Sequence, residues 1–142
     1  MAFSTYLADR ILGWVRGTTF PAALSNVFIS LHTGNPGDNG VNFDVTTQVT
    51  GSANRVGVGS GTFSSPATPG GGGRQITNNN VVQITTNAGV SAGTTQTVTH
   101  FGIWNSATGG DFLASGELTS SVAVQNGDTV QFNVGALAIR VI

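Results

Sequence analysis

The amino-acid sequence predicts a mainly β protein, a β-sandwich or jelly roll of seven or eight strands with one N-terminal amphipathic helix. Three observations lead to this fold class. Apolar and polar residues alternate with a period of two in several segments after Pro21. Clusters of Gly, Asn and Asp, which favour tight turns, separate these segments. The length of 142 residues fits a single domain, residues 1–142, because domains commonly have roughly 100–200 residues.

The first expected element is a helix over about residues 4–16. Its apolar side chains recur at helical spacing, at Phe3, Leu7, Ile11 and Trp14. Ser4 is expected to be its N-cap, and Gly17 is expected to follow its C-terminus. The apolar arc is wide for a surface helix. The helix therefore packs either on the sheet of its own chain or on a neighbouring subunit, and the sequence leaves both alternatives open.

Strands are expected after the helix. The segments with strand-like alternation are residues 26–32, 55–59, 80–85, 95–104, 112–118, 122–124 and 129–142. Residues 41–50 are expected to form a long loop. Within the strongest strand, the period of two places four residues on one face, namely Val98, His100, Gly102 and Trp104. A break at Gly135 and Ala136 is expected to shift the register of the last strand, as a β-bulge would.

Residues 64–73 are expected to form a flexible loop. They contain Pro66, Pro69 and four consecutive glycines, a composition that does not support a regular element. One interpretation is a solvent-exposed tip. The other is an arm that becomes ordered only against a neighbouring subunit, with Arg74 anchoring its end on a carboxylate or a carbonyl.

The composition excludes several classes of function. The chain has no Cys and no Lys, and its five Arg are balanced by six acidic residues, giving a net charge of −1. Disulfide frameworks, thiol nucleophiles and lysine Schiff bases are therefore excluded. So few positive charges argue against nucleic acid or a membrane as a partner. The N-terminus lacks the basic region of a secretory signal and carries Asp9 in its middle, so synthesis in a host cytoplasm is expected.

The residues that could carry chemistry form no recognisable constellation. His32 and His100 each lie in an expected strand, and two histidines without a third ligand do not define a metal site. Asp38 and Asp44 lack the spacing of an EF-hand. No Gly-x-Ser-x-Gly motif lies on an expected strand-to-helix turn. We therefore expect no enzyme, no cofactor and no metal, and a hydrolase that uses His100 or His32 is the remaining enzymatic alternative.

Residues 99–110, Thr-His-Phe-Gly-Ile-Trp-Asn-Ser-Ala-Thr-Gly-Gly, resemble a segment of small structural proteins of tailed bacteriophages. Such proteins begin with a short amphipathic helix, continue with a strand like residues 27–33 and end with a turn like residues 126–129 before a last strand. All these features occur here in that order, whereas residues 41–75 lie outside the resemblance. The resemblance implies a β-sandwich of the virion, from proteins labelled either tail-fibre-like or capsid cement (decoration) proteins.

Composition and resemblance together favour a capsid decoration protein. Such a protein would lie on the outer surface of the capsid and clamp neighbouring major capsid subunits. The alternative is a tail component or a receptor- or carbohydrate-binding module of the virion. Apolar surface in excess of what one small sandwich covers also predicts self-association, as a homotrimer. The expected interface residues are Phe3, Leu7, Ile11, Trp14 and Arg74.

Overall fold

The computed structural model describes residues 2–85 and 94–141 of the chain. Within these ranges the protein is mainly β, which confirms the predicted fold class. The described elements, in chain order, are β1 (Ala2–Phe3), α1 (Thr5–Val15), β2 (Asn26–His32), α2 (Thr46–Thr50), β3 (Val56–Gly59), a 3₁₀ turn (Ser60–Thr62), β4 (Arg74–Thr77), β5 (Val82–Thr85), β6 (Gln96–Trp104), β7 (Phe112–Val124), β8 (Thr129–Phe132) and β9 (Ala138–Val141).

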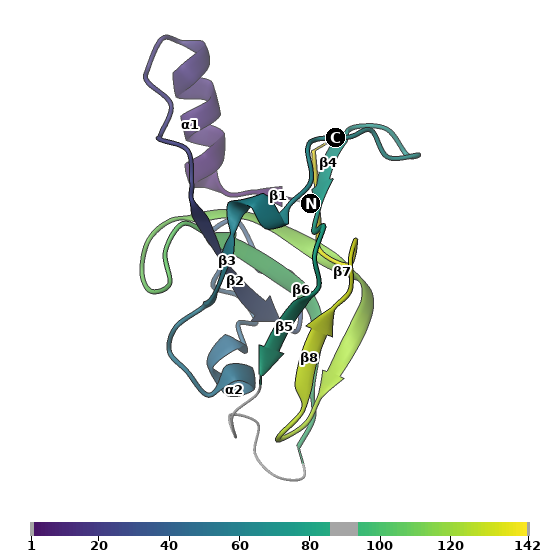
Figure 1. Cartoon of the computed structure of the whole chain (residues 1–142). Coiled ribbons are helices and arrows are strands. Elements are labelled where there is room, and N and C mark those ends of the chain that lie inside the picture. Colours follow the sequence, from purple (N-terminus) through teal and green to yellow (C-terminus); the bar gives the residue numbers. More distant parts are fainter. Residues whose placement is uncertain (1, 86–93, 142) are drawn as a thin grey trace.

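The strands form one larger sheet and two small ones, and all pairings are antiparallel (Figure 1). The larger sheet has five strands in the order β1-β7-β6-β2-β3. β4 pairs with β9, and β5 pairs with β8. The last predicted strand, residues 129–142, is therefore two strands that pair with different partners. This division gives two small ribbons, and β7 of the larger sheet contacts both β9 and β8.

One hydrophobic core joins the three sheets and α2. Its buried residues are Val27, Ile29, Leu31, Val45, Val49, Val82, Ile84, Val98, Phe101, Ile103, Leu118, Val124, Val130, Phe132 and Leu137. The larger sheet and the β5–β8 sheet supply buried residues of this core, and Ile139 of β9 packs against it, so the arrangement is sandwich-like.

β7 is a single bent strand, where the sequence predicted two short ones. Val98 of β6 pairs with Val122, whereas His100 pairs with Glu117, so one residue of β6 faces four residues of β7. Such an irregularity bends the strand that carries the extra residues. β7 therefore begins in the five-stranded sheet and turns a corner, so that its second half lies near β8 (Figure 1).

The same irregularity corrects the predicted faces of β6. The sequence placed Val98 on one face with His100 and Trp104. In the structure Val98 is fully buried and lies in the core with Phe101 and Ile103. A bulge breaks the simple alternation, because residues on either side of it no longer follow one period of two.

Residues 41–50 contain a short helix, whereas the sequence predicted a loop. The carboxylate Oδ1 of Asp44 accepts a hydrogen bond of 2.8 Å from the backbone N–H of Thr46, at the start of α2. Val49 is fully buried, and Gly51 ends the helix at a φ of 70°. Burial of Val49 in the core thus stabilises a helix in a segment whose residues favour strands.

Candidate interaction site

α1 is attached to the sheet at its base and projects away from it (Figure 1). The side-chain Oγ of Ser4 accepts a hydrogen bond of 3.0 Å from the backbone N–H of Leu7, which confirms the predicted N-cap. The backbone N–H of Ser4 donates to the carbonyl of Leu113 in β7, over 2.9 Å. Gly17 follows the helix with a φ of 97°, as predicted. The orientation of the helix is therefore set by its first turn.

The apolar face of α1 is open to solvent. No side chain of this helix is buried, and Leu12, Trp14 and Val15 are 65%, 62% and 74% exposed. Phe20, in the segment that returns to β2, is also exposed and lines a shallow hollow with Ile11 and Trp14. We call Ile11, Leu12, Trp14, Val15 and Phe20, which surround the outer end of α1, the helix surface. Leu12 and Trp14 lie on different sides of this end, because they are two positions apart. The sequence left open whether the helix packs on its own sheet or on a neighbouring subunit. Residues 11–15 of the helix do not pack on the sheet of their own chain.

Phe3 and Arg74 lie together in a second surface, an apolar groove between β1 and the ribbon of β4 and β9. The register pairs Arg74 with Val141 and Ile76 with Ile139, so these four residues share one face of the ribbon. The groove has a volume of about 220 Å³ and is lined by Phe3, Pro66, Arg74, Gln75, Ile76, Ile139 and Val141.

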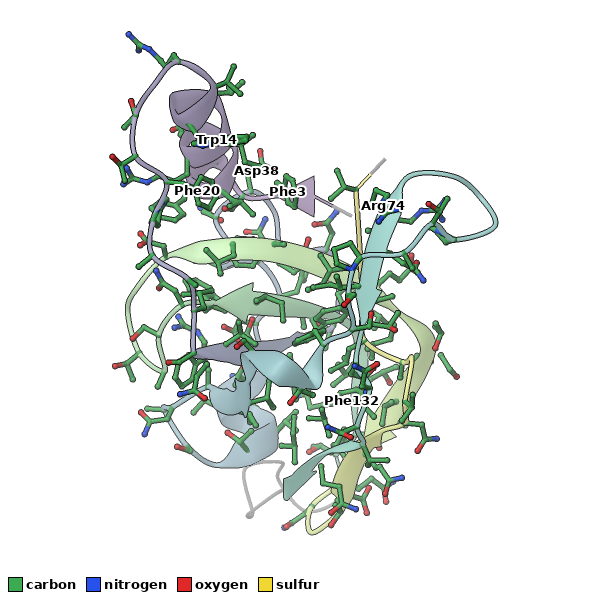
Figure 2. All side chains as sticks on the ribbon, turned by 45° about the horizontal axis from the view of Figure 1, so that its top comes forward. Phe3, Trp14, Phe20, Asp38, Arg74 and Phe132 are labelled. Carbon is green, nitrogen blue, oxygen red and sulfur yellow. The ribbon has the colours of Figure 1, made fainter. Side chains whose placement is uncertain are left out.

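The five predicted interface residues thus divide between two surfaces. Leu7, Ile11 and Trp14 lie along α1, and Phe3 and Arg74 lie in the groove. Trp14, Phe3 and Arg74 are found on the same end of the molecule, with Phe3 between the other two (Figure 2). Ile76, Ile139 and Val141 also line the groove and were not predicted, because nothing in the sequence indicates that β4 pairs with β9.

The Gly- and Pro-rich arm, residues 64–73, has hydrogen-bond partners within its own chain. Ala67 and Gln75 exchange two backbone hydrogen bonds, of 2.9 and 2.8 Å. The Arg74 guanidinium donates to Thr68 Oγ1 over 2.9 Å and to the carbonyl of Pro66 over 2.8 Å. Of the two interpretations left open by the sequence, an arm that becomes ordered only against a neighbouring subunit does not account for these contacts, because the carbonyl that Arg74 binds belongs to its own chain. The base of the arm therefore folds back on β4 through hydrogen bonds of its own chain.

A buried polar network lies on the face of the larger sheet opposite the core. Trp104 Nε1 donates to Ser30 Oγ over 2.9 Å, and Ser30 Oγ lies 2.7 Å from His32 Nε2. The other ring nitrogen, Nδ1, lies 2.8 Å from the carbonyl of Asn42. A carbonyl only accepts and an indole N–H only donates, so His32 carries its proton on Nδ1 and accepts the Ser30 hydroxyl proton on Nε2.

This network gives His32 a structural role. Burial lowers the pKa of His32, and the hydrogen bond to Asn42 only partly opposes that effect. Both ring nitrogens are occupied, so neither is available to a substrate. Across the ranges that the structure describes, no group of three or more His, Cys, Asp or Glu residues could hold a metal ion. None of the described helices is long and apolar enough to cross a membrane.

The segment that carried the resemblance, residues 99–110, is held in place by Arg55. Its guanidinium lies 3.5 Å from the centre of the Trp104 ring and donates hydrogen bonds to the carbonyls of Ser106 and Gly109. The motif is therefore a strand and a hairpin turn fixed by one arginine.

A family model described as Podophage GP4 fiber I protein gp80 matches residues 2–140. The chain belongs to this family. Membership of the gp80 fibre family confirms the resemblance to small structural proteins of tailed bacteriophages. A search of curated proteins finds no match. As a member of the gp80 fibre family, the chain is a structural protein of a phage virion.

Proposed function

We propose that this protein is a fibre subunit of a tailed phage, with a structural rather than an enzymatic role. We further propose that it assembles with copies of itself, as a homotrimer, through the helix surface. The observation that carries the proposal is the exposure of Leu12, Trp14 and Val15, each above 60%, on a helix that projects from the sheet. Membership of a family of phage fibre proteins supports the fibre assignment.

Burial of the helix surface would provide a large part of the association energy. Removing a Val, Leu or Phe side chain from water stabilises by roughly 1.5–3 kcal/mol, and a tryptophan offers even more area. Few charges oppose close approach, because charged residues make up only 8% of the chain. An exposed apolar surface of this kind is typical of a protein–protein contact.

A capsid decoration protein is the second candidate function. The resemblance in residues 99–110 supports it as well, because some proteins with such segments are capsid cement proteins. In that case the helix surface would bind the major capsid protein on the outer surface of the shell. The two candidates differ in the location of the protein on the particle and in its copy number.

Gold-labelled antibodies against this protein on intact virions distinguish the candidates. We expect label at the tail and few copies per particle. Label over the whole shell, with hundreds of copies, would support the decoration function instead. Purified virions that contain none of the protein would contradict both.

Sedimentation of the purified protein tests self-assembly through the helix surface. We expect the wild-type protein to associate with increasing concentration and Leu12→Asp to remain monomeric. Thr47→Asp introduces the same carboxylate at an exposed position of α2. It is the matched control and should associate like the wild type. A wild-type protein that is monomeric at all concentrations would contradict this part of the proposal.

A further inference from the structure

We infer that Trp14 of one copy of this chain docks in the groove of a second copy, with its indole ring against the Arg74 guanidinium. The inference rests on the proposed self-assembly and specifies its contact. It joins two apolar surfaces that are open to solvent, the projecting helix and the groove beside Phe3.

In the part of the chain that the structure describes, Trp14 has no cation over its ring, whereas Tyr6 and Trp104 each have an arginine there. The Arg10 guanidinium lies 4.9 Å from the centre of the Tyr6 ring, and Arg55 lies 3.5 Å from that of Trp104. Among the described residues no such cation lies over Trp14, which is 62% exposed. A cation over the face of a tryptophan is the strongest of these contacts, so an arginine from another copy is a chemically suited partner.

Arg74 is already held in position to receive a ring. Its two hydrogen bonds, to Thr68 Oγ1 and the Pro66 carbonyl, fix the plane of the guanidinium at the groove. Less side-chain entropy is lost on binding when a planar donor is fixed beforehand. The groove, at about 220 Å³, is smaller than the roughly 300–1,000 Å³ typical of small-molecule sites, and suits a single large side chain.

The helix of one copy does not cover the groove of the same copy. α1 rises from the opposite side of β1 and leads away from β4 (Figure 1), although both surfaces lie at the same end of the molecule (Figure 2). A contact between two different surfaces is heterologous, and its repetition builds either a closed ring or an open filament. A ring of three would give the proposed homotrimer, with each copy supplying one Trp14 and one groove.

Mixing of two defective variants tests the inference. Trp14→Ala removes the ring and leaves the groove, and Val141→Asp places a charge in the groove and leaves the ring. We expect each variant alone to associate at least roughly 30-fold more weakly than the wild type, as for the central residue of an interface. A one-to-one mixture should form mixed dimers, because the groove of the first variant accepts the ring of the second. Val81→Asp, at another half-exposed valine, is the matched control and should associate normally.

The results separate this contact from other modes of assembly. If the helices instead pack on each other, Val141→Asp associates like the wild type or the mixture shows no rescue, and either result overturns the inference while the proposed self-assembly stands. Arg74→Ala adds a test of the cation. It should weaken association roughly 2- to 30-fold in the wild-type background and have no effect in the Trp14→Ala background. An equal effect in both backgrounds would show that Arg74 acts on the arm and not on Trp14.

Discussion

The indole Nε1 of Trp104 donates a 2.9 Å hydrogen bond to Ser30 Oγ and thereby ties the end of β6 diagonally to the middle of β2. In the register of these strands Trp104 faces Phe28 and Ser30 faces Gly102. The bond also determines the direction of the Ser30 hydroxyl proton, which points to His32 Nε2. One serine thus satisfies two buried rings.

Replacement of Ser30 by Ala should lower the free energy of unfolding markedly. The change leaves both the Trp104 N–H and His32 Nε2 buried without a partner, and each unsatisfied group costs about 1–3 kcal/mol. Urea unfolding measures the effect. Ser121→Ala, at an exposed serine, should change the free energy of unfolding by less than about 0.5 kcal/mol. Equal stabilities of the two variants would contradict the network.

Stability should decrease as the pH falls below about 6.5. Burial lowers the pKa of His32 from its ordinary value of 6.5, so in this range the unfolded chain binds a proton that the folded chain does not. The contribution of His32 is therefore fully present above pH 6.5 and is lost as the pH falls toward the folded pKa. Urea unfolding at pH 7.5 and pH 5.5 measures this loss of free energy of unfolding. The full decrease should occur in the control variant His100→Gln, and a smaller decrease should occur in His32→Gln. A free energy of unfolding that rises toward pH 5.5 would refute this prediction.

Gly40→Ala should be among the most destabilising small changes in the chain. Gly40 has a φ of 75°, and an added Cβ would lie 2.5 Å from the Phe112 ring and 2.8 Å from the Trp104 ring. Left-handed strain of about 1–2 kcal/mol and overpacking of about 1–3 kcal/mol should add. Gly17→Ala is the matched control, because its φ is 97° but no atom lies within 4 Å. Thermal unfolding should show a clearly smaller loss for Gly17→Ala, and similar losses would mean that the ring contacts are unimportant.

Hydrogen exchange should divide the arm into two parts. The amides of Ala67 and Gln75 are bonded to each other's carbonyls and should exchange slowly in the isolated protein. The amide of Gly70, at the tip, should exchange fast. Uniformly fast exchange over residues 64–75 would show that the hairpin does not persist in solution. The comparison needs only the monomer, so Leu12→Asp can be used to prevent association.

Elements with a strong local pattern were predictable from the sequence. Apolar residues recur at helical spacing over residues 4–16, and Ser4 and Gly17 mark the two ends of the helix. The predicted range therefore differs from α1 only at its ends. α2 was missed because Thr-Thr-Gln-Val-Thr has the composition of a strand, and burial of Val49 outweighs that preference. β1 has only two residues, too few for any period.

The candidate site was only partly predictable for a different reason. The periodicity of α1 shows which side chains share a face but not what covers them, so the exposure of Trp14 needed the structure. The groove depends on the pairing of Arg74 with Val141, which are far apart in the chain. Such a pairing leaves no local signal in the sequence, because it depends on where the buried residue Leu137 places the start of β9.

The bent course of β7 has a mechanical consequence. α1 is fastened to β7 through Ser4 and through the pairing of β1 with Ser115, so a pull on the helix enters the molecule at that strand. Hydrogen bonds to a strand that is pulled along its length carry the load together, because they lie across the direction of the force. Since β7 runs from the larger sheet around the corner toward β8, tension along this strand would reach both layers of the sandwich.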